Sequence, residues 1–204
     1  VLYNIYRAMG YKVGLISTVC NYVDARPVEA THTTPDAISL NRLLAEMVAE
    51  GCQSAFMECS SHAIHQQRIG GLTFAGGIFT NLTRDHLAYH GTSEAYRDAK
   101  KLFFDQLGKD AFAITNADDR NGNIMVQNTA ATVRTYSTRA AADYRGRIVE
   151  ESIEGMLLDI DGREVSVPFV GRFNVSNLLG VYGAALQLGQ PADEILRVLS
   201  TLRP

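Results

Sequence analysis

Three side chains that could form a metal–phosphate site lie beside the ends of predicted strands and helices. Glu58 follows a short apolar run, His86 directly follows Asp85, and Lys100 lies on a strongly patterned helical segment. Carboxylates and imidazoles are common metal ligands, and a lysine that points inward must be paired or neutral. This combination favours a site for Mg²⁺ and phosphate over simple core packing.

Each of these residues also has a structural interpretation. Glu58 could interact with the dipole of the helix that follows it. His86 could form a local hydrogen bond with Asp85, and Lys100 could extend its ammonium group along the surface to water. Spacing alone leaves both interpretations open.

The helical pattern around Lys100 is the sharper signal. At 100° per residue, the apolar residues of this segment form one sector that includes Lys100, whereas Lys101 falls on the polar side. A desolvated, neutral lysine could react with CO₂ to give a carbamate, which is an acidic oxygen ligand suited to Mg²⁺. The sequence therefore predicts an inward Lys100 and an outward Lys101.

A second group of polar residues suits an extended anionic ligand. Thr33 and Thr34 precede one predicted helix, and Ser60 begins another, so hydroxyl and backbone N–H groups are available there. Gln66 and Arg68 lie near a helix end where both could reach one ligand, and a guanidinium pairs well with carboxylate or phosphate. Helix capping and a solvated arginine are the alternatives.

Two asparagines, Asn174 and Asn177, fall on one face of a helix's first turn. Capping explains one of them. The second could hydrogen-bond the edge of a nucleotide base.

The elements that would position these residues predict an α/β fold. Strands are expected over 12–19, 54–57, 74–79 and 111–115, and they alternate with helices over 1–9, 35–50, 60–70, 93–107, 174–188 and 192–202. This alternation indicates a doubly wound, mostly parallel sheet flanked by helices. Short alternating runs over 132–170 predict a small antiparallel sheet, residues 21–30 a hairpin or lid, and residues 85–90 a loop. We expect one domain over residues 1–204.

Composition excludes several classes of protein. The 204 residues are 46% hydrophobic and 20% charged, with a formal net charge of −3 and scattered basic residues, so neither nucleic acid nor an anionic membrane is an expected partner. No apolar run is long enough for a membrane span. The three cysteines have no CxxC spacing, which fits a reducing, cytoplasmic location, and Cys59 is expected to be a small buried residue.

Taken together, the motifs resemble the central ATP-binding domain of the Mur ligases, and most of all the E-type enzymes that add the third peptide residue of the peptidoglycan precursor. The matching stretches occur in family order and cover nearly the whole chain: Thr33-Thr34-Pro35, Glu58-Cys59-Ser60-Ser61-His62 through Arg68, Phe79-Thr80-Asn81-Leu82-Thr83-Arg84-Asp85-His86, Tyr89-His90-Gly91, Ala99-Lys100, and Gly171-Arg172-Phe173-Asn174 through Asn177.

The resemblance implies an amide-forming reaction. ATP would phosphorylate a carboxylate of UDP-N-acetylmuramoyl-L-alanyl-D-glutamate to an acyl phosphate, and the amine of a diamino acid would then displace phosphate. It also implies roles for residues: Glu58, His86 and a carbamylated Lys100 as catalytic Mg²⁺ ligands, Thr33, Thr34, Ser60, Gln66 and Arg68 as contacts to the UDP-muramoyl-dipeptide, and Asn177 with Asn174 as contacts to ATP.

Departures from the family pattern set further expectations. The glycine-rich phosphate loop is not found, so we expect a fragment truncated before residue 1 and after residue 204 that is inactive alone. Other Mur-type or folylpolyglutamate-type ligases, and a non-catalytic domain that binds nucleotide-sugar peptides, are the alternatives. We expect a monomer; the choice between meso-diaminopimelate and L-lysine stays open.

Overall fold

The computed structural model describes residues 1–30, 32–82 and 87–203, and it confirms an α/β fold. The chain forms two compact units, one of Val1–Leu72 with Asp98–Leu102 and one of Thr73–Arg97 with Phe103–Pro204. Each unit is described by itself below. The single domain predicted for residues 1–204 stays a prediction.

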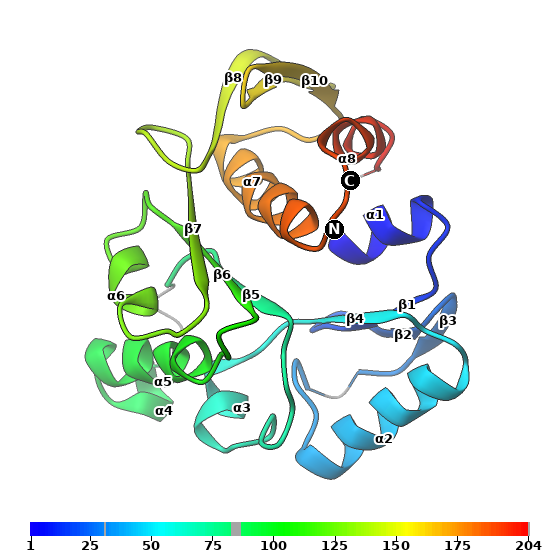
Figure 1. Cartoon of the computed structure of the whole chain (residues 1–204), viewed down its shortest axis with the longest axis vertical. Coiled ribbons are helices and arrows are strands. Elements are labelled where there is room, and N and C mark those ends of the chain that lie inside the picture. The colour runs from blue at the N-terminus through cyan, green and yellow to red at the C-terminus, as the bar shows by residue number, and fades with distance from the viewer. Residues whose placement is uncertain (31, 83–86, 204) are drawn as a thin grey trace. The chain divides into compact units, whose positions relative to one another are not determined.

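The first unit contains a four-stranded mixed sheet with the order β3-β2-β1-β4. Strands β1 and β4 are parallel, whereas β1, β2 and β3 are antiparallel neighbours, so residues 21–30 form the hairpin rather than a lid. Helices α1 and α2 cover opposite faces of this sheet (Figure 1). The elements are α1 (Leu2–Ala8), β1 (Val13–Ile16), β2 (Asn21–Val23), β3 (Arg26–Val28), α2 (Ala37–Ala49), β4 (Ser54–Met57) and α3 (Ser61–His65).

Helix α2 packs very closely on β1 of this sheet. A Cβ atom on Gly14 would lie 2.2 Å from the sulfur of Met47, so a side chain at this strand position would require Met47 to move. The strand predicted over 54–57 is confirmed, but it is not the buried strand that its apolar residues suggested. Strand β4 is the edge of the described sheet, and its residues are exposed or half-exposed.

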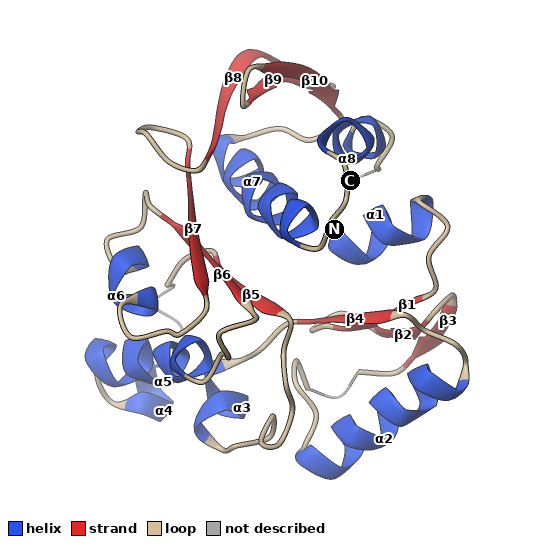
Figure 2. Ribbon diagram, viewed as in Figure 1, coloured by secondary structure: helices blue, strands red, loops and turns tan. Residues whose placement is uncertain are grey.

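The second unit contains a six-stranded sheet with the order β10-β9-β8-β7-β6-β5 (Figure 2). Its elements are β5 (Gly76–Phe79), α4 (Leu87–His90), β6 (Phe112–Asn116), α6 (Gly122–Val126), β7 (Thr132–Ser137), β8 (Tyr144–Ser152), β9 (Gly155–Ile160), β10 (Arg163–Val167), α7 (Arg172–Gln187) and α8 (Ala192–Leu199). Helix α5 (Ser93–Asp105) has residues in both units. Residues 87–90 are helical, which corrects the loop predicted over 85–90 for its described part.

Strand β7 corrects another expectation. Its alternating pattern predicted an antiparallel hairpin, but β7 runs parallel to β6 over its whole length. Strand β8 pairs in parallel with β7 at its start and then antiparallel with β9. Alternation reports which face of a strand is buried and not its direction, so the pattern could not separate the two cases. The antiparallel strands β8–β10 therefore extend the main sheet.

Helices cover both faces of the second sheet. Helix α7 packs across β5–β8 on one face (Figure 1), and a Cβ atom on its Gly183 would lie 2.6 Å from the ring of Tyr144. On the other face, α6 and the end of α5 contribute to an apolar cluster built from Phe79, Phe104, Leu107, Ala111, Ala113, Met125 and Ala131. Each face of this sheet is therefore covered by at least one helix.

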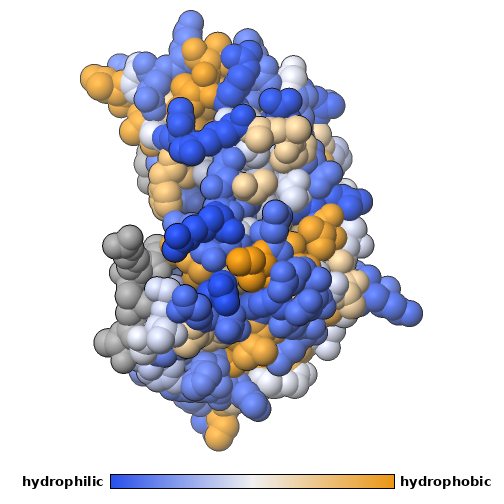
Figure 3. Space-filling model, turned by 90° about the vertical axis from the view of Figure 1, so that its left-hand side faces the viewer, coloured by the Kyte–Doolittle hydropathy of each residue, from blue (hydrophilic) through white to orange (hydrophobic). Residues whose placement is uncertain are grey.

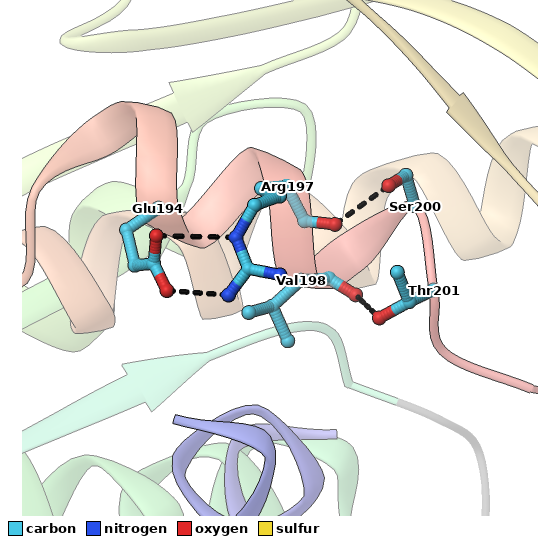
Figure 4. Close-up of polar contacts among 5 residues, drawn as sticks. All are labelled: Glu194, Arg197, Val198, Ser200 and Thr201. Carbon is cyan, nitrogen blue, oxygen red and sulfur yellow. Dashed lines mark hydrogen bonds and ion pairs between the residues drawn. The ribbon is translucent and has the colours of Figure 1, made fainter. Parts of the chain in front are cut away.

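Helix α8 packs against β10 and α7. Figure 4 shows polar contacts within this helix and at its C-terminal end. The Arg197 guanidinium binds both carboxylate oxygens of Glu194 one turn earlier. The hydroxyls of Ser200 and Thr201 donate to the carbonyls of Arg197 and Val198, at 2.6 and 2.8 Å. The Ser200 hydroxyl thus binds a carbonyl of the last turn, and the Val198 carbonyl also accepts the Thr201 N–H.

On the face drawn in Figure 3, hydrophobic residues form small separate groups among hydrophilic ones. Among the described residues, no helix combines the length and the apolar character that crossing a bilayer requires.

Candidate functional site

Parallel strands β1 and β4 bring two polar residues to the same edge of the first sheet. Ile16 pairs with Met57, so Thr18 and Glu58 both lie just beyond the carboxyl ends of their strands. The Thr18 backbone N–H and hydroxyl both donate to Oε2 of Glu58, at 3.2 and 2.7 Å. Thr18 therefore orients the predicted metal ligand. Sequence reasoning missed Thr18, because the strand was predicted to run to residue 19 whereas β1 ends at Ile16.

Thr34 is the buried anchor of this edge, with 0% of its surface exposed. Its hydroxyl donates to the Glu58 carbonyl at 2.9 Å and accepts from the Ser60 N–H at 3.2 Å. The hydroxyl of the adjacent Thr33 lies 3.0 Å from that of Thr18. One hydrogen-bonded cluster therefore contains Thr33, Thr34, Glu58 and Ser60, which joins the predicted metal ligand to three predicted substrate contacts.

Helix capping does not account for the two threonines. Helix α2 is capped by Asp36, whose carboxylate accepts the Ser39 N–H at 3.0 Å. Ser60 does cap α3, because its hydroxyl accepts the Ala63 N–H at 3.1 Å. Thr33 and Thr34 thus join the loop to the strand edge instead of beginning the helix.

Gln66 and Arg68 lie together just after α3, which ends at His65, earlier than predicted. The Arg68 guanidinium donates through Nη1 to the Thr34 carbonyl at 2.9 Å, and through Nε and Nη2 to Oε1 of Gln66 at 3.0 and 2.7 Å. A cavity of about 340 Å³ opens beside them, lined by His32, Asp36, Ala37, Gln66 and Arg68. Gln66 and Arg68 therefore meet at one cavity after the helix end, and a ligand bound by both stays a prediction.

The predicted metal cluster is only partly described. Glu58 is exposed and Lys100 is half-buried, whereas His86 lies outside the described residues. Within the described ranges, no group of three histidine, cysteine, aspartate or glutamate side chains could hold a metal ion. A site shared by Glu58, His86 and Lys100 therefore stays a prediction.

Lys101 corrects the helical-wheel interpretation of α5. It was expected on the polar side, but only 7% of its surface is exposed, and Lys100 is the more exposed of the two lysines. An ideal wheel assumes one buried face, whereas this helix also buries residues outside the expected sector.

The two asparagines of the second unit lie in the first turns of α7, which begins at Arg172. Asn174 donates through Nδ2 to the Val170 carbonyl at 2.7 Å, so its amide is used locally. In the described part of the chain, the half-buried Asn177 side chain forms no hydrogen bond. Asn177 is therefore the better candidate for a ligand contact.

Cys59, expected to be a small buried residue, is half-buried. Burial raises the pKa of its thiol to about 12, so the reactive thiolate is suppressed at neutral pH.

Comparison with known proteins gives a consistent result. The model of the Mur ligase middle domain matches residues 1–185. The chain is 62% identical to a UDP-N-acetylmuramoyl-L-alanyl-D-glutamate–2,6-diaminopimelate ligase of Phocaeicola vulgatus, 59% identical to one of Bacteroides thetaiotaomicron and 37% identical to one of Geobacillus thermodenitrificans. All of this chain aligns, but it covers only 42%, 42% and 44% of those proteins.

Solved structures agree with this match. A ligase structure described by the same activity has a TM-score of 0.87 and 28% identity, over 99% of this chain and 43% of that one. The D-alanyl-D-alanyl ligase of Acinetobacter baumannii, with a TM-score of 0.76 and 15% identity over 99% of this chain and 42% of that one, shares the fold.

Proposed function

The chain belongs to the Mur ligase family, and from this premise we propose that it is the middle domain of an ATP-dependent ligase in peptidoglycan synthesis. The complete enzyme would join UDP-N-acetylmuramoyl-L-alanyl-D-glutamate to 2,6-diaminopimelate, the acceptor named for the relatives. The observation that carries the proposal is the Thr34-centred cluster, because it joins the predicted metal ligand Glu58 to residues predicted to bind the UDP-muramoyl-dipeptide.

The cavity beside Arg68 fits the peptide end of that substrate. Arg68 is held by Thr34 and Gln66, so its guanidinium is oriented before a ligand arrives. A preorganised guanidinium binds carboxylates with little additional ordering. Thr33 and Ser60 would add hydroxyl contacts at the same edge.

The donor set also fits Mg²⁺. Both contacts from Thr18 use Oε2 of Glu58, so the carboxylate is oriented while Oε1 could coordinate a hard cation. His86 and Lys100 would complete the ligands. Carbamylation of Lys100 would join its neutral amine to the carbon of CO₂ with loss of one proton. Bound Mg²⁺ would neutralise charge on the phosphates during transfer.

The proposed reaction has two steps. The γ-phosphoryl group of ATP passes to a carboxylate of the UDP-muramoyl-dipeptide, which gives an acyl phosphate and ADP. The acceptor amine then attacks the acyl carbon, and phosphate leaves as the amide forms. In this scheme the chain's residues mainly position the reactants, with Arg68 and Gln66 at the peptide and Asn177, with Asn174, at the nucleotide.

The direct test is product formation by the complete protein that contains this domain. With Mg²⁺, ATP, UDP-N-acetylmuramoyl-L-alanyl-D-glutamate and 2,6-diaminopimelate, we expect one ADP and one amide product per turnover by mass spectrometry. Faster product formation with L-lysine than with 2,6-diaminopimelate would identify L-lysine as the acceptor instead. Turnover only with D-alanyl-D-alanine or with folate and glutamate would favour another ligase, and substrate binding without ADP formation would favour a non-catalytic domain.

A cytoplasmic location and a monomeric state complete the proposal. Cell fractionation and sedimentation of the complete protein would check them.

A further inference from the structure

A buried amide connects three segments of the second unit. Asn116, the last residue of β6, is 8% exposed. Its Nδ2 donates to the Thr80 carbonyl at 2.9 Å and to the Ser176 hydroxyl at 3.4 Å, and its Oδ1 accepts from the Asp118 N–H at 2.9 Å. One side chain therefore links the end of β5, the start of α7 and the turn after β6.

Tyr136 of β7 also binds the end of β5. It is fully buried, and its hydroxyl donates to the Phe79 carbonyl at 3.2 Å. Burial raises the pKa of this hydroxyl, so the group keeps its proton. The carbonyls of Phe79, which ends β5, and of Thr80 just after it are thus bound by side chains from β7 and β6.

We propose that the β5–α7 network, formed by Asn116, Tyr136 and Ser176, positions the nucleotide contacts of the ligase. Ser176 directly precedes Asn177 in the first turns of α7. By fixing this hydroxyl against the end of β5, the network sets the position of the Asn177 amide. None of the three residues needs to touch ATP itself. The inference rests on the proposed function, because it assigns these residues to the ATP side of that reaction.

Packing alone does not explain the network. Leu178, Leu179 and Tyr182 already bury α7 against the sheet. A buried polar network gains little net stability over apolar packing, but it requires one specific geometry. Small displacements of a binding group reduce catalysis strongly, so a fixed geometry has its greatest effect where a ligand is held.

The adjacent residue of β6 supplies a matched control. Thr115 is also fully buried, but its hydroxyl donates to the Gly122 carbonyl of α6 at 2.8 Å, away from α7. Thr115→Val therefore removes one buried hydrogen bond without touching the β5–α7 network. Ser176→Ala should fold, because alanine favours the helix and Ser176 is only half-buried.

The experiment compares the complete wild-type ligase with Ser176→Ala, Ser176→Thr and Thr115→Val. Ser176→Ala should raise KM for ATP about three- to tenfold, the range of one lost hydrogen bond. KM for the UDP-muramoyl-dipeptide should stay unchanged, and Ser176→Thr should restore KM for ATP. Thr115→Val should lower Tm and leave both KM values unchanged.

Two results would overturn the inference while the proposed function stands: wild-type turnover with an unchanged KM for ATP in Ser176→Ala, or an equal rise in Thr115→Val. Absence of wild-type turnover on every substrate would instead refute the proposed function, and this inference with it.

Discussion

The two compact units use buried polar residues in different ways. In the first unit, Thr34 is buried but its partners Glu58 and Gln66–Arg68 lie at an exposed edge beside a cavity. In the second unit, Asn116 and Tyr136 are buried with their partners, and they support a helix whose Asn177 is only half-buried. The first arrangement presents several groups to a ligand, whereas the second orients one helix end.

This difference explains which residues tolerate change. An exposed side chain such as Glu58 can be altered with little loss of stability, so its effect on turnover can be measured separately from any effect on folding. A buried anchor such as Thr34 changes stability and function together. The predictions below use this contrast, and all refer to the complete ligase.

The largest expected effect is at Glu58. Glu58→Gln removes the charge that would hold Mg²⁺, so turnover should fall by about 10²–10³-fold with an unchanged Tm. The coupled release of ADP checks this. Glu50→Gln, at an exposed position after α2, is the charge-matched control and should behave as wild type. Equal losses in both variants would contradict a specific role for Glu58.

The two neighbouring lysines should separate function from stability. Lys100→Ala should lower turnover by about a hundredfold, as expected for loss of a metal-site group, and short carboxylic acids added to the assay should restore part of it. Lys101→Ala should instead lower Tm, because Lys101 is buried, and added acid should not rescue it. Unchanged turnover in Lys100→Ala would refute the carbamate.

Thr34→Val tests the anchor of the first unit. The substitution keeps the shape but removes bonds to the Glu58 carbonyl and the Ser60 N–H, which should cost about 1–3 kcal/mol of unfolding free energy. KM for the UDP-muramoyl-dipeptide should rise as well. Thr34→Ser retains the hydroxyl and should preserve KM. Urea unfolding and initial rates measure the two effects.

The smallest effect concerns Asp118, in the turn beside Asn116. Burial opposes its charge, but hydrogen bonds from Ser137 and Thr138 outweigh this and hold the pKa of Asp118 below its usual range. The stability that ionised Asp118 contributes to the folded state is therefore fully present above the unfolded pKa, about 3.9. It is lost as pH falls through the folded pKa. Asp118→Asn should flatten the acid limb of Tm against pH, whereas the exposed Asp110→Asn should not.

Sequence reasoning found the residues that stand out chemically at strand and helix ends. Glu58 was predicted as a metal ligand, and Thr34 and Arg68 as contacts to an extended ligand; the structure joins all three in one hydrogen-bonded cluster. The fold class followed from the alternation of strands and helices. Local patterns are sufficient for these features because they depend on segment ends and periodicity.

The missed features depend on long-range pairing. The direction of β7 is set by its pairing with β6, and the burial of Lys101 by its tertiary surroundings, neither of which a local pattern contains. Asn116 was not among the predicted site residues, because its partners Thr80 and Ser176 are 36 and 60 residues away. Buried anchors of this kind become visible only in three dimensions.

The central claim is that the two substrates of one ligation reaction depend on different polar anchors, and a double-mutant cycle tests it most directly. Steady-state KM values for ATP and for the UDP-muramoyl-dipeptide would be measured in wild type, Thr34→Val, Ser176→Ala and the double variant. We expect Thr34→Val to raise only KM for the UDP-muramoyl-dipeptide and Ser176→Ala to raise only KM for ATP. The two effects should be additive in the double variant. Equal rises of both constants in each single variant would contradict the account.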